Sequence, residues 1–521
     1  MSQKEELDFV TQKNRKQLEK VFADTISLGL DFKLGKLNKK NVVDYRLQDE
    51  IMRDILESLP IKSKDIKQVL KECENKIIKG SVNFSSQNFI AFPDSGNSTA
   101  ALCGQIRSGM LNQNLINSMH TSPTATFVEI AVVRWLREVI GFKNRELKDI
   151  TDLGGIAVTG GTLSNTIAVL LAREDKYPGT IKKGLINSSK SLKMFIPEGI
   201  GHYTSKAAMG WLGIGTDNIV EVKTTKNFVI DKDDLIKKIE LTRKDSTPFL
   251  LIAYAGDSRT MAIDDLTELS KIAKKYNLWF HVDACHGASL CFSDKLKYKV
   301  KGIDLADSVT LDPHKVLFVP YCLSYLLIKN PEKFKSIAGV SDLITKEKYS
   351  IGQITPFLGS KPFDSLKLWF LIKHLGKKKI GKLIENRYGS VKYFESIVKK
   401  SKSFYVMNEV MINSVAYLYI PEELKWSLKS DKKERSVEIV NELNLRIQKA
   451  IFKEGVYYVH TFKLNDFKNI LGAGEDKIFQ MQRLMIGNPL TKKNDLKDFL
   501  AYSNSISDRE WKRLKSELNN N

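Results

Sequence analysis

The chain is 521 residues long, with 42% hydrophobic residues and a formal net charge of +21. This length exceeds what one simple core supports, so two or three structural units are expected, and the composition is that of an ordinary globular protein. No apolar run reaches the roughly 20 residues that a membrane-spanning helix needs, and the polar N-terminus shows no apolar signal segment. We therefore expect a cytoplasmic protein without a membrane partner.

The excess of positive charge raises the question of nucleic-acid binding. Lysine is spread along the whole chain and often stands beside acidic residues, as in KKIELTRKD, and no basic run is interleaved with aromatic residues. A solvated lysine-rich surface is the favoured interpretation, so no nucleic-acid partner is predicted. A protein that uses this surface to hold RNA or an acidic partner is kept as an alternative.

The cysteines argue for a reducing compartment. There are five of them, an odd number, and no two form a CxxC pair: Cys73, Cys103, Cys285, Cys291 and Cys322. This pattern disfavours both a disulfide framework and a structural zinc site.

Residues 1–95 are predicted to form an N-terminal helical segment. Apolar residues recur at helical spacing from Leu47 to Leu59, and Pro60 ends the pattern. The segment has too few apolar residues for a core of its own. We expect it to pack against another part of the protein, such as a second subunit.

Residues 96–375 are predicted to form a large α/β domain. Short apolar runs alternate there with helical stretches, from GIAVTGG to CLSYLLIKN, which is typical of a mainly parallel sheet covered on both faces. Residues 376–521 mix helices with strand-like stretches and are predicted to form a smaller α+β domain. In parallel sheets ligands bind beyond the C-terminal strand ends, so the residues there are the candidates for chemistry.

Two strand ends carry weak signals when each is considered alone. Gly160-Gly161-Thr162 leads directly into an apolar helix; glycine allows close approach of a ligand, and the free N–H groups of a first helical turn favour an anion. His202 follows the next strand and could stack on a flat aromatic ring or transfer a proton. In isolation, an ordinary turn and a histidine packed on a helix start are the favoured interpretations.

The third strand end reads HVDACHG, with Asp283 closing a hydrophobic strand. A carboxylate is costly to bury there unless a positive partner meets it, and a protonated pyridine nitrogen is one such partner. A metal site built from His281, Asp283 and His286 is disfavoured, because no further cluster of ligands is evident. His286 could instead influence proton delivery or the choice of substrate.

The fourth strand end carries Asp312-Pro313-His314-Lys315. A lysine at this place can be partly desolvated, which lowers its pKa and makes the amine a nucleophile toward an aldehyde. A lone lysine would be interpreted as a surface residue. Its place beside the other three strand ends reverses that interpretation.

These segments in this order resemble the group II decarboxylases of amino acids that depend on pyridoxal 5′-phosphate (PLP). The resemblance runs from about residue 80 to the C-terminus and includes SPTAT, TGGTLSN, HYTSKAA, HVDA, ADSVTLDPHK and DSLKLW. It implies the fold-type I architecture, with a large domain built on a mainly parallel seven-stranded sheet, an N-terminal helical segment and a small C-terminal α+β domain. It also implies a homodimer.

The resemblance implies a role for each matching residue. Lys315 would carry the cofactor covalently, Asp283 would pair with its pyridinium nitrogen, and His202 would stack on its ring. Cys285 would lie near the opposite face of the ring, and Thr124 in the loop through which the substrate enters. The phosphate would be held by Gly161, Thr162 and His314, with Asp312 nearby.

The implied reaction is α-decarboxylation of an L-amino acid to an amine and CO2. Arg483 stands where glutamate-type members bind a substrate carboxylate, which favours an acidic amino acid such as glutamate or aspartate. Aromatic and diamino acids remain open alternatives. So does a lyase like the sphingosine-phosphate lyases, which share the Asp-x-His-Lys loop.

Two departures from the family pattern bear on chemistry. Ala255-Gly256-Asp257-Ser258-Arg259 stands where relatives read Ala-Gly-Thr-Thr, which predicts a carboxylate and an arginine near the cofactor. The mobile loop of the family corresponds to residues 336–360, and its only tyrosine, Tyr349, does not fall clearly at the place of the usual proton donor. Without such a donor, oxidative deamination becomes conceivable.

Overall fold

The computed structural model describes residues 7–37, 42–185, 190–339 and 347–520. Its largest feature is a seven-stranded sheet with the order β1-β7-β6-β5-β4-β2-β3. The strands are β1 (Gly155–Val158), β2 (Leu192–Pro197), β3 (Ile219–Val222), β4 (Thr247–Tyr254), β5 (Trp279–Asp283), β6 (Ser308–Leu311) and β7 (Ser324–Ile328). Within this sheet β7 runs antiparallel to both of its neighbours and the other pairs are parallel. The prediction of a mainly parallel sheet is confirmed.

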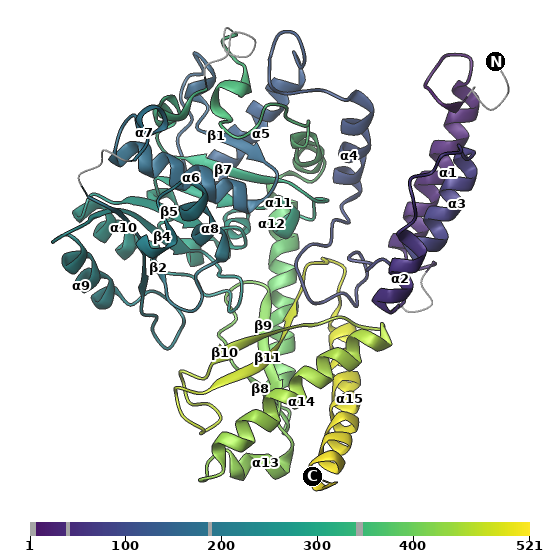
Figure 1. Cartoon of the computed structure of the whole chain (residues 1–521), viewed down its shortest axis with the longest axis vertical. Coiled ribbons are helices and arrows are strands. Elements are labelled where there is room, and N and C mark those ends of the chain that lie inside the picture. Colours follow the sequence, from purple (N-terminus) through teal and green to yellow (C-terminus); the bar gives the residue numbers. More distant parts are fainter. Residues whose placement is uncertain (1–6, 38–41, 186–189, 340–346, 521) are drawn as a thin grey trace.

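Helices cover this sheet on both faces (Figure 1). They include α5 (Ala125–Ile140), α6 (Gly161–Lys176), α8 (Tyr203–Trp211), α9 (Lys232–Thr242), α10 (Leu266–Lys275) and the short α11 (Pro313–Val316). The strands β1, β5, β6 and β7 are buried along their whole length. Their side chains therefore face apolar layers on both sides, which explains why the sequence shows continuous apolar runs there instead of alternation.

A second, antiparallel sheet has the order β10-β11-β9-β8. Its strands are β8 (Phe404–Val406), β9 (Ser414–Tyr419), β10 (His460–Asn465) and β11 (Ile478–Met485), and α13 (Glu422–Ser427), α14 (Lys433–Glu454) and α15 (Lys493–Asn520) accompany them. The long helix α12 (Ser365–Lys399) joins the two sheets, and Gly376 has a non-helical φ of 63° inside it. The boundary near residue 375 therefore falls within a kinked helix.

The N-terminal helices stand apart from the body of the molecule (Figure 1). They are α1 (Arg15–Lys33), α2 (Gln48–Ile55) and α3 (Ile66–Lys76), and α4 (Thr99–Leu111) follows them on the body. Helix α2 ends at Ile55, although the apolar spacing predicts that it continues to Pro60. No residue of α2 is buried, and short helices are marginal without packing.

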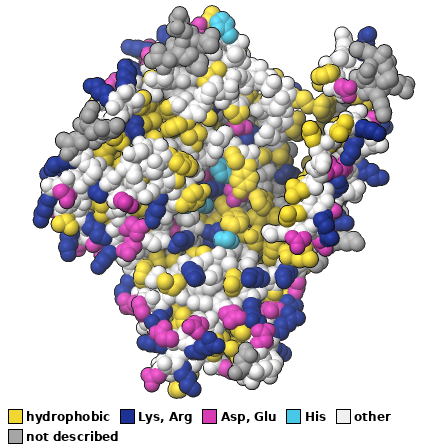
Figure 2. Space-filling model, in the orientation of Figure 1, with side chains coloured by type: hydrophobic (Ala, Val, Ile, Leu, Met, Phe, Trp, Pro, Cys, Tyr) yellow, Lys and Arg dark blue, Asp and Glu magenta, His cyan; other side chains and the backbone are white. Residues whose placement is uncertain are grey.

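Apolar side chains of this N-terminal segment are exposed. Leu34 is 70% exposed, Leu59 is 88% exposed and Ile61 is 99% exposed. Figure 2 shows hydrophobic side chains gathered on the surfaces where the N-terminal helices face the body. Exposed apolar area of this kind marks surfaces that contact other proteins or membranes.

Basic and acidic side chains interleave over the lower part of the molecule (Figure 2). Many lysines there and elsewhere are paired with nearby carboxylates, as Lys271 is with Glu268 at 2.6 Å and Lys515 with Glu423 at 3.1 Å. In the ranges that the structure describes, no helix is long and apolar enough to cross a membrane.

Candidate active site

The four strand ends singled out in the sequence meet at one cavity of about 300 Å³. Segments that are far apart in the chain converge there because β1, β2, β5 and β6 all end at the same edge of the sheet. Eight of the ten residues predicted for the site line the cavity: Gly161, Thr162, His202, Asp283, Cys285, Asp312, His314 and Lys315. The other two, Thr124 and Arg483, lie outside its lining.

Lys315 lies on α11 beside a buried carboxylate. Its Nζ is 2.8 Å from Oδ2 of Asp312, which is completely buried, whereas a quarter of the lysine side chain is exposed. Burial alone would lower the pKa of Lys315, but the Asp312 carboxylate outweighs it and holds that pKa well above its ordinary value. Lys315 and His314 in turn overcome the effect of burial on Asp312 and lower its pKa to about 2.

This ion pair corrects one expectation. The sequence led us to expect a desolvated lysine of lowered pKa, but the structure gives the opposite direction. The reason is that Asp312, one helical turn away, meets the amine directly. An asparagine at that position would not supply this negative charge.

Asp283 ends β5 and is held by two donors. The side-chain amide of Asn165 donates to Oδ2 at 2.8 Å, and the backbone N–H of Cys285 donates to Oδ1 at 3.2 Å. Asp283 is 6% exposed and lines the cavity. A carboxylate fixed in this way presents a directed negative charge to whatever occupies the cavity.

Asn165 is a site residue that sequence reasoning missed. Its amide nitrogen also donates to Thr204 Oγ1 at 3.0 Å, and its amide oxygen accepts from Thr310 Oγ1 at 2.8 Å and contacts Nε2 of His281 at 3.1 Å. All of these groups are buried. The only signal in the sequence was the Ser-Asn pair opening the helix after the glycines, and that pair does not reveal its distant partners.

His281 belongs to this internal network. Its Nδ1 lies 2.8 Å from Ser308 Oγ, and burial lowers its pKa to about 4, so the ring is uncharged near neutral pH. In the described part of the chain, no group of three or more potential ligands could hold a metal ion.

His202 caps the start of α8. Its Nδ1 lies 2.9 Å from Thr204 Oγ1, and its backbone N–H donates to the hydroxyl of Tyr254 at 2.8 Å. Burial lowers the pKa of His202, and the attraction of Asp283 opposes this only in part. The ring is therefore neutral near pH 7 and keeps a fixed orientation at the cavity wall. Tyr254, like Asn165, lines the cavity without having been predicted.

The glycine turn after β1 leaves room for a ligand and for its neighbours. Gly160 has a φ of +112°, a conformation that favours glycine. A Cβ placed on Gly161 would lie 3.0 Å from both Cys285 Sγ and Asp312 Oδ2. Gly161 and Thr162 form the first turn of the 16-residue helix α6, where free N–H groups favour an anion. His314 is oriented by the Leu323 carbonyl, 2.7 Å from its Nδ1.

Asp257 and Arg259 do not occupy the places expected of them. Asp257 is completely buried and accepts hydrogen bonds from the backbone N–H groups of Arg259, Thr260 and Ala262 at 2.7 to 2.8 Å. Its carboxylate therefore stabilises its own turn. Arg259 is exposed and donates to the Gly199 carbonyl. Of this segment, Gly256 and Ser258 line the cavity.

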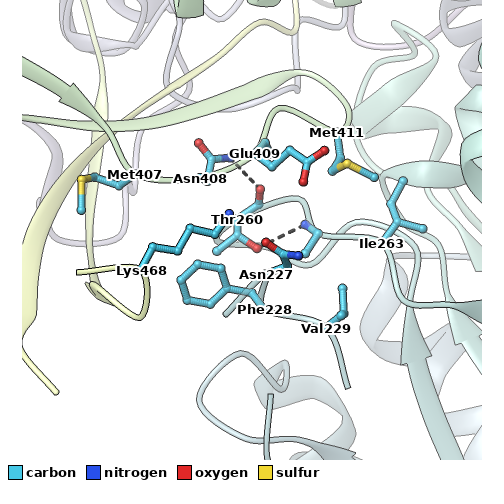
Figure 3. A pocket seen from close by; sticks show the side chains of 11 residues that line it. Asn227, Phe228, Val229, Thr260, Ile263, Met407, Asn408, Glu409, Met411 and Lys468 are labelled. Carbon is cyan, nitrogen blue, oxygen red and sulfur yellow. Dashed lines mark hydrogen bonds between the residues drawn. The ribbon is translucent and has the colours of Figure 1, made fainter. Parts of the chain in front are cut away.

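The Asp257 turn also contacts the C-terminal sheet region. Figure 3 shows Asn408 reaching toward Thr260, and its amide donates to the Thr260 carbonyl at 2.8 Å. A second cavity of about 170 Å³ lies on this side of the turn, with Phe228 and Lys468 among the residues around it. The turn thus separates the two cavities.

Arg483 lies behind the turn. It is 6% exposed, donates to the carbonyls of Ser258 and Ala91, and lies over the ring of Phe92. Burial lowers its pKa to about 10, which leaves the guanidinium charged at neutral pH. Among the described residues, no carboxylate forms an ion pair with Arg483 within 4.0 Å.

Thr124 and Tyr349 both lie outside the lining of the cavity. Thr124 is exposed immediately before α5, and the ring of Phe127 on that helix contacts the ring of Tyr349 with centroids 5.5 Å apart. Residues 340–346 of the predicted mobile loop fall outside the described residues. Neither Thr124 nor Tyr349 lines the cavity in the described part of the chain.

Solved structures of PLP decarboxylases share this fold. Mouse CSAD in its apo form superposes with a TM-score of 0.85 at 23% identity, covering 95% of this chain and 99% of that one. Tryptophan decarboxylase of Catharanthus roseus, solved with L-tryptophan, gives a TM-score of 0.79 at 23% identity, covering 96% of this chain and 99% of that one. This chain therefore shares its fold with these two solved proteins.

Residues 49–420 match the family model described as the pyridoxal-dependent decarboxylase conserved domain, and the chain belongs to this family. Its cofactor is pyridoxal 5′-phosphate. Aspartate 1-decarboxylase of Aliivibrio fischeri is 28% identical over 499 residues, covering 90% of this chain and 89% of that protein. An acidic amino acid decarboxylase of Xenopus tropicalis is 29% identical, covering 85% and 86%. Aromatic-L-amino-acid decarboxylase of Bacillus atrophaeus is 26% identical, covering 82% and 85%.

Proposed function

We propose that the protein is an L-amino-acid α-decarboxylase whose substrate is an acidic amino acid, aspartate or glutamate. The observation that carries the substrate class is Arg483, a buried guanidinium directly behind Ser258 in the cavity wall and without a carboxylate partner among the described residues. A buried cation of this kind is stabilised by an anionic ligand. Relatives named for aspartate and for acidic amino acids support the same class.

The lining residues fit the cofactor. Lys315 would bind the aldehyde of PLP covalently, and the first turn of α6 at Gly161 and Thr162, together with His314, would hold its phosphate. Asp283 would pair with the pyridinium nitrogen and His202 would stack on the ring. Asp312 would stay beside Lys315, and Cys285 would lie against the ring face. When bound there, PLP supplies an electron sink for the pair of electrons left by departing CO2.

The chain itself supplies orientation and protons. Asn165 fixes the Asp283 carboxylate, and through Thr204 it also fixes the tautomer of His202. Asp312 holds a proton on Lys315 Nζ, so this group can return a proton to the substrate Cα after CO2 has left. His202 and His281 are uncharged near neutral pH and serve as fixed packing and hydrogen-bonding groups.

A substrate screen tests the proposed reaction. The holoenzyme is incubated with the twenty amino acids, cysteine sulfinate, diaminobutyrate and DOPA, and both CO2 and H2O2 are measured. We expect CO2 from aspartate or glutamate without matching H2O2. CO2 from only aromatic or diamino acids would overturn the proposed substrate class, and stoichiometric H2O2 would show oxidative deamination. Aldehyde release from a phosphorylated amino alcohol would favour the sphingosine-phosphate-lyase-like alternative.

Arg483→Met is expected to weaken selection of the acidic substrate. Removing the buried positive charge behind the cavity wall should lower kcat/KM for aspartate or glutamate by about 100-fold, mostly through KM, while Arg483→Lys recovers part of the loss. Steady-state kinetics of the two variants check this. The exposed Arg435→Met serves as the control for loss of an arginine. An unchanged KM in Arg483→Met would show that the guanidinium only holds the Ser258 turn.

We further propose that the protein works as a homodimer. The exposed apolar residues of the N-terminal helices need a partner surface, and Thr124 and Tyr349 lie where they do not line the cavity of their own chain. A second subunit would cover the exposed apolar residues, and Thr124 and Tyr349 could reach the cavity of that second subunit. Sedimentation at rising dilution is expected to give a dimer of the 59.1 kDa chain. A fully active monomer would contradict this.

Two further proposals concern the chain as a whole. A cytoplasmic location is supported by its five free cysteines. The division into units 1–95, 96–375 and 376–521 is supported by where the two sheets lie, although α12 spans the second boundary.

A further inference from the structure

His286 differs from the other histidines at this end of the sheet. A ring nitrogen of His202 contacts Thr204, one of His281 contacts Ser308, and one of His314 contacts the Leu323 carbonyl. The ring of His286 makes no hydrogen bond with any described residue, and its Nδ1 is sealed from solvent without a partner. Yet the side chain is buried, only 6% exposed, and lines the cavity that holds Lys315.

The backbone around His286 is firmly held, so this ring is not a loose surface group. The N–H of Gly287 donates to the Ala255 carbonyl at 2.8 Å, and the hydroxyl of Ser289 donates to the His286 carbonyl at 3.0 Å. Gly256 packs close by: a Cβ built on it would lie 3.2 Å from the His286 Cβ. The backbone and Cβ of His286 are thus held beside Ala255 and Gly256, whereas the polar atoms of its ring make no hydrogen bond with a described residue.

Charge explains which role the ring can play. Burial, reinforced by Lys315, lowers the pKa of His286 well below its ordinary value, and Arg483 acts in the same direction. The ring is uncharged near neutral pH, so it does not store the proton that returns to Cα. An uncharged imidazole offers one N–H donor and one acceptor nitrogen, which suits recognition.

The positions of Lys315 and Arg483 indicate which part of a substrate would contact the His286 ring. His286 lines the same cavity as Lys315 and Ser258, and Arg483 lies behind Ser258. A substrate attached at the Lys315 end, with its side chain directed toward the Ser258 wall, would lie in the cavity that His286 lines. The other ring nitrogen, Nε2, is neither hydrogen-bonded nor sealed among the described residues, so it is the atom that a ligand in the cavity can reach. An aromatic or aliphatic substrate side chain would leave it unpaired, and such a mismatch is a strong source of rejection.

We propose that His286 determines substrate specificity by hydrogen-bonding the side-chain carboxylate of the amino acid, while Arg483 neutralises its charge. This inference rests on the proposed function and deepens it: His286 and Arg483 together select a substrate with a short acidic side chain. Neither residue alone distinguishes such a side chain from other anions, because Arg483 supplies charge and His286 supplies the directed bond.

The test compares His286→Leu, which keeps similar volume without polar atoms, with His286→Gln, which keeps a donor and an acceptor. Holoenzyme kinetics are measured with L-aspartate, L-glutamate and L-DOPA. We expect His286→Leu to lower kcat/KM for the acidic substrate roughly 10- to 100-fold, mainly through KM, with DOPA unchanged or improved. His286→Gln is expected to recover most of the loss. The exposed His374→Leu is the matched control and is expected to behave as wild type.

A second measurement is independent of turnover. Binding of succinate, a dicarboxylate that cannot react, is followed by calorimetry, and His286→Leu is expected to weaken it by the same factor. If wild type decarboxylates aspartate or glutamate but His286→Leu binds and turns over within about twofold of it, this inference alone is wrong. If wild type acts on neither acid, the proposed substrate class fails and this inference with it. Equal loss on every substrate together with loss of bound cofactor would show a purely structural role and overturn it.

Discussion

Lys315→Ala is expected to abolish decarboxylation, with a fall in kcat on the order of 10⁴-fold or more, as for loss of a covalent catalytic residue. The substitution removes the only lysine that lines the cavity in the described part of the chain. The visible absorbance band of covalently bound PLP should disappear with it. Rate measurements and an absorption spectrum of the purified variant check both results.

The control is Lys301→Ala, because Lys301 is an exposed lysine preceding β6 in the same part of the chain. It should keep wild-type rate and spectrum. Activity in Lys315→Ala that stays within tenfold of wild type would mean that another amine carries the cofactor, which is incompatible with the roles proposed above.

Asp283→Asn is expected to lower kcat by about 10²- to 10³-fold, the usual effect of removing a group that stabilises developing charge. The neutral amide cannot keep the pyridinium nitrogen protonated, so electrons from the broken bond have a poorer acceptor. One of the two hydrogen bonds that Asp283 accepts, from Asn165 and from the Cys285 N–H, is also lost, because an amide has a single acceptor oxygen. KM should change far less than kcat, and steady-state kinetics distinguish the two effects.

A matched control is Asp304→Asn, which neutralises an exposed carboxylate outside the cavity. Its kinetics should equal those of wild type. Should Asp283→Asn keep full kcat, the carboxylate would be a structural partner of Asn165 and not a partner of the cofactor.

The large sheet and the meeting of the strand ends were predictable from the sequence. Strands buried on both faces give continuous apolar runs, and glycine, histidine, aspartate and lysine each stand directly after one of them. Because parallel strands end at a shared edge, residues as distant in sequence as Gly161 and Lys315 line one cavity. The prediction of this geometry depends only on local sequence patterns, which a single sequence displays.

The parts that escaped prediction depend on partners that are distant in sequence or hidden in a turn. Asn165 gains its importance from Asp283 and His281, and no local pattern joins them. The Asp257 carboxylate was expected near the cofactor because its own turn was not visible in the sequence. The pKa of Lys315 was expected to fall because burial was foreseen, whereas the 2.8 Å contact with Asp312 was not.

The most direct test of the whole account is to locate the cofactor on the chain. The holoenzyme is treated with borohydride to make the link between PLP and protein permanent, digested, and analysed by mass spectrometry. The account predicts a single modified peptide with the pyridoxyl group on Lys315. A label on any other lysine, or no label on a catalytically active protein, would contradict it.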